Sequence, residues 1–232
     1  MAIVYGRKRK MNQKTLELLK AEYKKIFKDV YEAGGGYGFR YQHAIRVLTY
    51  CQKFLKIPRL KKRKINRDAL FIAAIYHDAG KMRAVDQDGK LIYGKYGGRS
   101  HEAIGAEIVS KYISKYIKDK KLVKLVEKII REQEPGVKPT MVESKLLKDA
   151  DRLDNAGLLH IWRSITYANY EKKNLEGLGE FWRSKEGRMH DLECLKKYHF
   201  REIQKVAIKR FKKLDKLIKE LFIEAEGKDL SF

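Results

Sequence analysis

Apolar residues recur at intervals of three and four along most of this sequence, and no comparable stretch alternates apolar and polar residues. The clearest example is Ile104, Ile108, Tyr112 and Tyr116, which form one apolar stripe over about four helical turns. A second such stripe runs through residues 203–221 near the C-terminus. Because side chains three and four apart share one helical face, we predict an all-α fold, a bundle of packed helices.

Turn-forming residues separate these helices without dividing the chain into domains. Pro135 and Pro139 enclose a turn between two helices, because proline lacks the backbone N–H that a helix interior requires. The glycines within residues 34–38 form a flexible joint, and a new helix is expected to begin near Tyr41. With 232 residues, 44% of them hydrophobic, we expect one core and a single compact domain over residues 1–232.

Residues 82–100 are the segment least suited to a helix. They are rich in glycine and lack helical periodicity, and the pair Asp88-Gly89 favours a tight turn, as in a small hairpin. We predict a mobile loop here.

The polar pair His77-Asp78 directly follows a strongly apolar segment. Residues 69–76 are apolar on every side, which predicts a buried helix. A buried imidazole and a buried carboxylate are costly unless they are paired or bind a cation, so a metal ion would explain their position. Taken alone, the pair is explained more simply as a helix C-terminus that Gly80 closes.

Two further polar residues strengthen the case for a metal. His43 lies 34 residues before His77 on a segment with helical apolar spacing, and Asp151 lies 73 residues after Asp78, at the head of a further helix. Packing of these helices brings two imidazoles and two carboxylates to one point. Such mixed ligands suit a divalent ion, drawn from Mn, Mg, Co, Ni, Fe and Zn, and leave positions open for water and phosphate oxygens.

Three blocks in this order resemble the HD superfamily of metal-dependent phosphohydrolases. HDAGK at residues 77–81 is similar to the family's H-D-x-G-K form, and SHEAIGAEIV at 100–109 is similar to its third block. KDADRLDNAG at 148–157 resembles the closing aspartate block of the small stand-alone members. The resemblance implies an HD-domain helical bundle with a motif core of about residues 40–170, on which an N-terminal helix and a C-terminal basic amphipathic helix pack.

The same resemblance implies a reaction and a set of metal ligands. The reaction is hydrolysis of a phosphomonoester or phosphodiester bond in a nucleotide or small phosphorylated metabolite, by a water that the metal activates. The implied metal ligands are His43, His77, Asp78 and Asp151.

Neighbouring residues are assigned to catalysis and to the substrate. Lys81 lies three residues after Asp78, where its charge would offset that of a phosphate, although a solvated lysine at a helix end has the same appearance in sequence. Arg152 is assigned to the substrate, and both Arg152 and Asp154 are placed to orient the last metal ligand. Asn155 stands where the related (p)ppGpp hydrolases carry a substrate-contacting asparagine.

The third block leaves the number of metal ions open. In family members with two ions, a histidine of this block and another histidine one helix later hold the second ion. His101 is present, but residues 131–134 read Arg-Glu-Gln-Glu, so we favour one ion. Glu132 or Glu134 would replace the missing histidine in a two-metal site, and otherwise His101 and Glu102 act on phosphate or water beside a single ion.

The formal net charge of +23 attracts polyanions. Eight Lys or Arg residues and no acid lie between Lys53 and Arg67, and ten basic and two acidic residues lie between Lys196 and Lys219. Such runs usually form a solvated face, and lysine-rich chains are also typical of proteins from hot environments. As partners we expect a phosphorylated small molecule or nucleotide, with nucleic acid as a further partner on the basic surface.

Two alternative functions follow from this charge. The first is an HD-type metal-dependent nuclease that acts on single-stranded DNA or RNA. The second is a non-catalytic nucleic-acid-binding module that keeps its metal for stability alone. Substitution of His77 and Asp78 distinguishes the two, because it would abolish cleavage but leave binding by such a module intact.

The remaining expectations concern the environment of the protein. No run of 18 or more apolar residues occurs, and the N-terminal residues MAIVYGRKRK lack the apolar stretch of a secretory signal, so we expect a cytoplasmic protein without membrane association. Cys51 and Cys194 are isolated, and we expect both to be free thiols.

Overall fold

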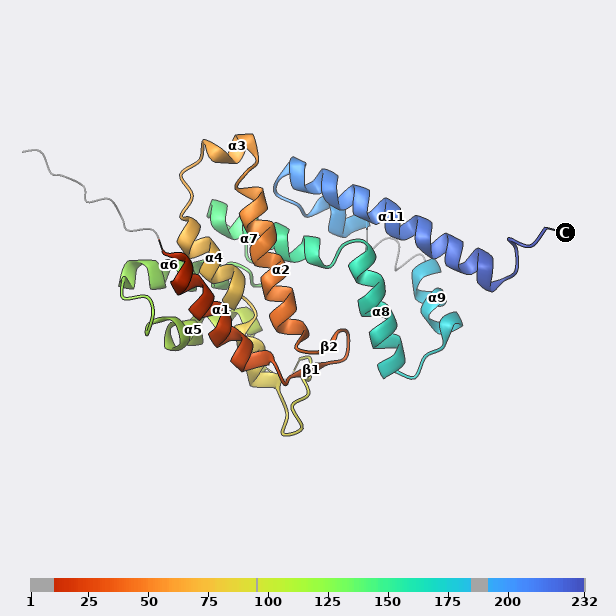
Figure 1. Cartoon of the computed structure of the whole chain (residues 1–232), viewed down its shortest axis with the longest axis horizontal. Helices are drawn as coiled ribbons and strands as arrows, with labels where there is room; N and C mark the ends of the chain where they lie inside the picture. Colours follow the sequence, from red (N-terminus) through yellow and green to blue (C-terminus); the bar gives the residue numbers. More distant parts are fainter. Residues whose placement is uncertain (1–10, 95, 185–191, 232) are drawn as a thin grey trace, which may run out of the picture.

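The computed structural model describes residues 11–94, 96–184 and 192–231 of the chain. Within this part the protein consists of helices and one two-stranded hairpin, which confirms the predicted all-α fold (Figure 1). The expectation drawn from residues 1–10, that no signal sequence begins the chain, lies outside the described residues. In chain order the elements are α1 (Gln13–Phe27), β1 (Tyr31–Glu32), β2 (Gly36–Tyr37), α2 (Phe39–Phe54), α3 (Pro58–Lys61), α4 (Arg67–Tyr76), the 3-10 helix η1 (Ala79–Ala84), α5 (His101–Ile113), α6 (Lys120–Arg131), α7 (Val142–Asp154), α8 (Leu158–Tyr170), α9 (Leu175–Arg183) and α11 (Arg201–Ala225).

Helix α4 lies at the centre of the bundle. It packs against α1, α2, α6 and α7, and α5 packs against α6 and η1. The α4 side chains Leu70, Ile72 and Ile75 are fully buried, as the apolar sequence of residues 69–76 predicts. Because the last turn and a half of α4, residues 72–76, is fully buried, the polar residues that follow it enter the protein interior.

Side-chain caps fix where the helices of the site begin. The Oδ1 atom of Asn66 accepts a hydrogen bond from the backbone N–H of Ala69, and this starts α4. The Oγ atom of Ser100 likewise accepts from the N–H of Ala103, which makes His101 the first residue of α5.

The glycines of residues 34–38 form a hairpin rather than a flexible joint. Strands β1 and β2 pair antiparallel, and α2 begins at Phe39, two residues before the predicted Tyr41. A Cβ atom on Gly35 would lie 2.2 Å from the ring of Phe39, so the turn packs directly on the start of α2. The earlier start follows from this contact, which the spacing of apolar residues does not reveal.

Residues 82–100, of which Lys95 is not described, contain the predicted tight turn. The N–H of Asp86 donates to the carbonyl of Lys90 at 2.9 Å, and Gly89 has a φ of +75°, which favours glycine. Residues Val85 and Leu91 form an antiparallel bridge across this turn. Residues 82–84, the first of this segment, belong to η1, which ends at Ala84.

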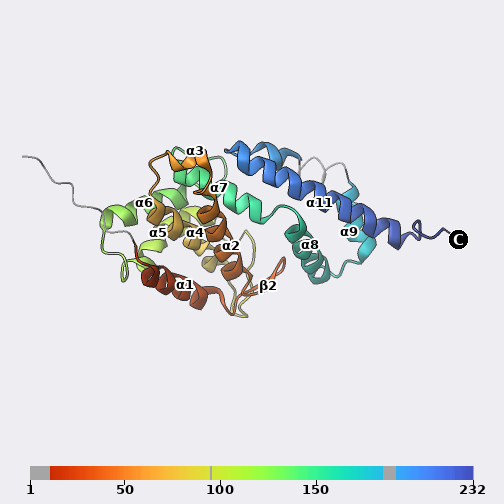
Figure 2. The same ribbon diagram turned by 45° about the horizontal axis from the view of Figure 1, so that its top comes forward.

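Helices α8, α9 and α11 extend from one end of the bundle (Figures 1 and 2). Helix α11 packs against α7 and α8, and α8 packs against α9. The start of α11 is tied to α7 because the carboxylate of Asp149 accepts hydrogen bonds from the backbone N–H groups of His199 and Phe200. No helix in the described ranges is long and apolar enough to cross a membrane.

Candidate metal centre

Three helices supply the residues that were predicted to bind metal. His43 lies on α2, His77 is the residue that ends α4, and Asp78 follows it directly. Asp151 was expected at the head of a helix, but it lies in the last turn of α7. The apolar residues before and after Asp151 belong to two different helices, α7 and α8. These helices are separated at Gly157, where φ is +84°, and the sequence pattern does not show this break.

The two imidazoles and Asp151 form a compact group. The Nε2 atoms of His43 and His77 lie 3.1 Å apart, and the Oδ1 atom of Asp151 lies 3.2 Å and 3.8 Å from them. The Oδ2 atom of Asp78 lies 3.5 Å and 3.7 Å from the same two nitrogens. The structure therefore brings all four predicted ligands together.

The hydrogen bonds of the two rings define their tautomers. The Nδ1 atom of His43 lies 2.7 Å from the Asp154 carboxylate, and the Nδ1 atom of His77 lies 3.0 Å from the carbonyl oxygen of Ala74. Both partners only accept, so Nδ1 carries the proton in each neutral ring and Nε2 presents a lone pair. Two lone pairs facing each other repel unless a cation lies between them. These residues therefore fit a divalent metal ion.

The spacing and exposure of the group agree with that fit. Ligand atoms that share one ion at bond lengths of about 2.0–2.2 Å lie about 3–4 Å from one another, as these atoms do. The side chains of His43 and His77 are 1% and 4% exposed, whereas that of Asp151 is 41% exposed. The group is therefore open to solvent on its Asp151 side.

The charges around the group keep both carboxylates ionised. Burial would raise the pKa of Asp78, but the neighbouring charges of Lys81, His77 and Arg40 hold it well below its ordinary value. The pKa of Asp151 is also well below its ordinary value, since its contacts with His43 and His77 outweigh the desolvation of its carboxylate. Anionic oxygens are thus available to a cation at neutral pH.

The residues predicted for catalysis surround Asp78. The Nζ atom of Lys81 lies 3.0 Å from the Asp78 carboxylate, and Lys81 is buried, so it contacts a predicted ligand rather than the large pocket described below. The Nε2 atom of His101 lies 3.2 Å from the Oδ1 atom of Asp78 and 3.3 Å from the Oε1 atom of Glu102. The buried Oε2 atom of Glu102 has no hydrogen-bond partner among the described residues.

Glycine at position 80 is what allows His101 to approach Asp78. A Cβ atom on Gly80 would lie 1.9 Å from the carbonyl oxygen of His101 and 2.7 Å from the backbone nitrogen of Gly105. Only a residue without a side chain lets η1 and α5 come this close. The glycine of HDAGK therefore sets the distance between the second and third sequence blocks.

Glu132 does not join this group. Its carboxylate accepts hydrogen bonds from the hydroxyl and N–H of Thr140, at 2.5 Å and 3.1 Å, and from the N–H of Met141 at 3.4 Å. These contacts tie the end of α6 to the segment before α7. Both oxygens of Glu132 therefore accept hydrogen bonds from that segment.

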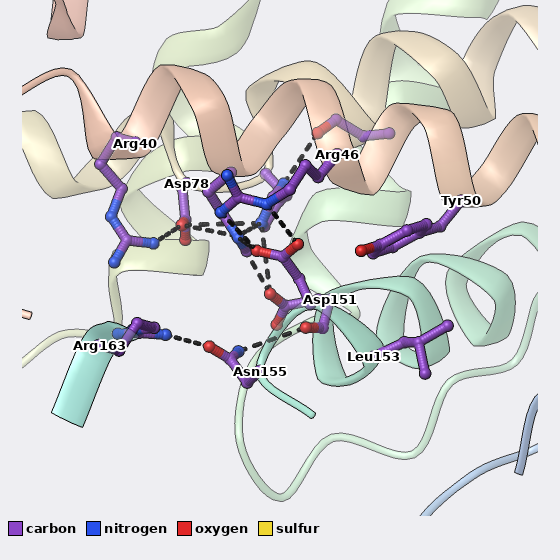
Figure 3. Close-up of polar contacts among 12 residues, drawn as sticks. Arg40, Arg46, Tyr50, Asp78, Asp151, Leu153, Asn155 and Arg163 are labelled. Carbon is purple, nitrogen blue, oxygen red and sulfur yellow. Dashed lines mark hydrogen bonds and ion pairs between the residues drawn. The ribbon is translucent and has the colours of Figure 1, made fainter. Parts of the chain in front are cut away.

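A pocket of about 660 Å³ lies on the exposed side of Asp151. Arg152 and Asn155, both predicted to contact substrate, line it together with Arg163 of α8. The Nη1 atom of Arg152 donates to the carbonyl oxygen of Lys197 at 2.6 Å, whereas Asn155 donates to the carbonyl oxygen of Asp151 at 3.3 Å and accepts from Arg163 (Figure 3). Other side chains that line the pocket are Tyr93, His160, Tyr167, Lys173 and Tyr198.

Sequence reasoning missed four charged residues of the site. They are Glu32, Arg40, Arg46 and Arg163. Arg40 and Arg46 lie three residues before and after His43, on the same side of α2, and this spacing was a usable signal. Glu32 and Arg163 lie outside the three recognised blocks and carry no comparable signal.

Comparison with known proteins agrees with this arrangement. A family model described as the HD domain matches residues 40–156. No curated protein matches the chain. Among solved structures, Bacillus subtilis YpgQ in complex with ADP has a TM-score of 0.62 and 17% sequence identity, covering 90% of this chain and 93% of that chain.

Two further structures show the same fold. A protein from an uncultured Thermotogales bacterium, described as a predicted HD superfamily hydrolase, has a TM-score of 0.60 and 21% identity over 92% of this chain and 99% of that chain. An HD-superfamily hydrolase from Bacillus thuringiensis has a TM-score of 0.61 and 18% identity over 92% of this chain and 98% of that chain. At such identities the likeness concerns the fold alone.

Proposed function

The chain belongs to the HD-domain family, and from this premise we propose that it is a metal-dependent phosphohydrolase of a nucleotide or small phosphorylated metabolite. The observation that carries the proposal is the pair of Nε2 atoms of His43 and His77, 3.1 Å apart, which lie beside the Asp151 carboxylate while the Nδ1 atom of each ring faces an acceptor. A divalent ion bound there would polarise a phosphoryl oxygen and lower the pKa of a bound water. The proposed ion is one of Mn, Mg, Co, Ni, Fe and Zn.

The protein's own residues then have separate tasks. His43, His77, Asp78 and Asp151 hold the ion, and His101 with Glu102 lies where a proton can be taken from water or given to a leaving group. The substrate enters the pocket on the Asp151 side, where Arg163 and Arg152 offset its negative charge.

A nucleotide fits this pocket in size and chemistry. The volume of about 660 Å³ lies within the usual range of small-molecule sites. The aromatic rings of Tyr93, Tyr167 and Tyr198 offer faces for a base, and the arginines offer partners for phosphate. The capture of ADP by YpgQ, which has the same fold, supports this choice.

The test is metal analysis joined to a substrate screen. Wild-type protein and Asp78→Ala are stripped of metal, reloaded with each ion in turn and offered a panel of nucleotides, phosphomonoesters and phosphodiesters. We expect the wild type to release phosphate or nucleoside with at least one ion, and Asp78→Ala to lose that activity. If no ion supports hydrolysis of any substrate, the proposal is rejected.

The nuclease alternative is supported by one contact. Arg59 of α3 lies with its guanidinium 5.9 Å from the ring of Phe200 and 3.7 Å from Glu202 at the start of α11. The two basic segments of the sequence, 53–67 and 196–219, thus meet on one side of the molecule. Metal-dependent cleavage of single-stranded DNA or RNA that is absent in Asp78→Ala would favour this alternative over hydrolysis of small substrates.

A further inference from the structure

A buried ion pair outside the recognised sequence blocks adjoins the metal ligands. The side chains of Arg40 and Glu32 are 3% and 1% exposed. The Nε and Nη2 atoms of Arg40 donate to the two oxygens of Glu32, and its Nη1 atom donates to the Oδ2 atom of Asp78. One guanidinium therefore joins a strand carboxylate to a predicted metal ligand, and Figure 3 shows the contact between Arg40 and Asp78.

The oxygen that Arg40 contacts is the one that faces the imidazoles. The Oδ2 atom of Asp78 is the carboxylate oxygen that lies 3.5 Å from His43 and 3.7 Å from His77. The other oxygen, Oδ1, lies 3.2 Å from the Nε2 atom of His101. Because the rigid fork of Arg40 is held at two points by Glu32, it fixes the rotation of the Asp78 carboxylate.

Glu32 also balances the charge around Asp78. Two buried cations, Arg40 and Lys81, contact the Asp78 carboxylate and compete with any ion for it. The carboxylate of Glu32 neutralises Arg40, so that Asp78 keeps negative charge for a further cation. Without Glu32, the full charge of Arg40 would be directed at Asp78.

Glu32 is in turn contacted from two other parts of the molecule. The hydroxyl of Tyr93, in the segment 82–100, donates to its Oε1 atom. The Nη2 atom of Arg163, on α8 at the pocket, lies 3.7 Å from the same oxygen. Glu32 therefore connects both walls of the pocket to Asp78 through Arg40.

We propose that Glu32 and Arg40 are positioning residues that act as one unit to orient the Asp78 carboxylate and preserve its affinity for a divalent cation. The inference rests on the proposed metal site. Neither Glu32 nor Arg40 is proposed to contact the substrate or the ion, because both residues act through Asp78.

The test measures metal affinity by calorimetry with Mn²⁺ and by the absorption spectrum of bound Co²⁺. Glu32→Gln and Arg40→Met are each expected to weaken binding about 10- to 100-fold, the usual effect of removing a residue that orients a ligand. The double variant is expected to bind no more weakly than the worse single variant, because the two residues act through one contact. Arg40→Lys retains the charge but not the fork, and it is expected to lie between Arg40→Met and the wild type.

The matched control is Glu22→Gln. Glu22 also accepts from a cation and a tyrosine hydroxyl, Lys115 at 2.7 Å and Tyr116 at 3.3 Å, but within the described part of the chain it makes no hydrogen bond or ion pair with the predicted metal ligands. It is expected to leave metal affinity unchanged. Circular dichroism and melting of the metal-free variants establish that each is folded at the assay temperature.

The outcomes separate this inference from the proposed function. If the wild type binds neither ion, the proposed metal site itself fails. If the wild type binds metal but Glu32→Gln and Arg40→Met bind equally well, or if their losses simply add, the positioning unit is overturned. Should Glu32→Gln not fold, Tyr93→Phe removes a single donor to Glu32 with both charges retained, and a smaller loss of affinity is expected, whereas no loss would contradict the inference.

Discussion

The Nδ1 atom of His43 lies 2.7 Å from the Oδ2 atom of Asp154, and this contact fixes which nitrogen of His43 faces the metal centre. A carboxylate accepts only, so the proton stays on Nδ1 and Nε2 keeps its lone pair. Asp154 was expected to orient Asp151, its neighbour in sequence. Instead it orients a histidine 111 residues away.

We predict that Asp154→Asn weakens metal binding about 10- to 100-fold. The asparagine keeps an oxygen that can accept from Arg46, but its amide would donate to Nδ1 of His43 and move the ring proton to Nε2. The measurement is calorimetric titration of the metal-free protein. The control is Asp149→Asn, which alters a second carboxylate–imidazole pair, with His199 at 2.8 Å, away from the predicted ligands. Equal affinities in Asp154→Asn and the wild type would show that Asp154 does not set the tautomer.

We predict that Arg163→Ala raises the KM for the substrate about 10-fold or more, with a smaller change in kcat. Arg163 lines the pocket and donates to the neutral Asn155, and the carboxylate it faces at 3.7 Å, that of Glu32, is already paired with Arg40, so the charge of Arg163 is available to a phosphate. Steady-state kinetics with the best substrate of the screen provide the measurement. Arg131→Ala, a half-exposed arginine of α6 that lies 3.8 Å from Glu107, should leave both constants unchanged. An unchanged KM in Arg163→Ala would remove this residue from the substrate site.

The sequence was sufficient to predict which four side chains come together, His43, His77, Asp78 and Asp151, because three of them belong to short recognised blocks and His43 lies on a segment with helical apolar spacing. His77 and Asp78 follow the segment 69–76, which is apolar on every side, and the structure buries this segment except for the partly buried Phe71. Asp151 was correctly grouped with the two histidines but was placed at the wrong end of a helix. The turn at Gly157 separates the apolar patterns of α7 and α8, which resemble one continuous helical pattern in the sequence.

The residues that sequence reasoning missed owe their positions to tertiary packing. Glu32 contacts Arg40, Tyr93 and, at 3.7 Å, Arg163, which come from three separate segments of the chain. No periodicity or short motif relates these positions, and only tertiary contacts place them together. The same reason explains why a hairpin replaced the flexible joint at residues 34–38.

We predict that Gly80→Ala destabilises the protein by about 1–3 kcal/mol or more, because the added Cβ atom would overlap the backbone of α5. The displaced helix carries His101, so the variant should also lose activity beyond what its stability explains. Urea unfolding and kinetics at low temperature measure the two effects. The control for stability is Gly177→Ala, where the nearest atom to the new Cβ would lie at 3.5 Å and no loss of stability is expected. A stable, fully active Gly80→Ala would show that η1 and α5 need not approach so closely.

Glu132 provides a prediction that depends on pH. Burial would raise its pKa, but hydrogen bonds from the segment 140–144 outweigh burial and lower the pKa below its ordinary value of 4.5. A carboxyl whose pKa is lower in the folded state stabilises the protein fully above its unfolded pKa, and this contribution is lost as pH falls through the folded pKa. Glu132→Gln should therefore reduce the free energy of unfolding by about 1–3 kcal/mol at pH 7. The difference from the wild type should shrink as the pH falls below about 4.5.

The same variant tests the number of metal ions. If Glu132 serves only to tie α6 to the segment before α7, Glu132→Gln keeps the metal stoichiometry and affinity of the wild type while losing stability. Urea unfolding at pH 7 and pH 3.5, with metal analysis of the same samples, gives both quantities. Glu134→Gln, two residues along the chain, is the control for stability and is expected to match the wild type. A fall from two bound ions to one in Glu132→Gln would instead make Glu132 a ligand of a second metal, because loss of a hydrogen bond to Thr140 would not remove an ion.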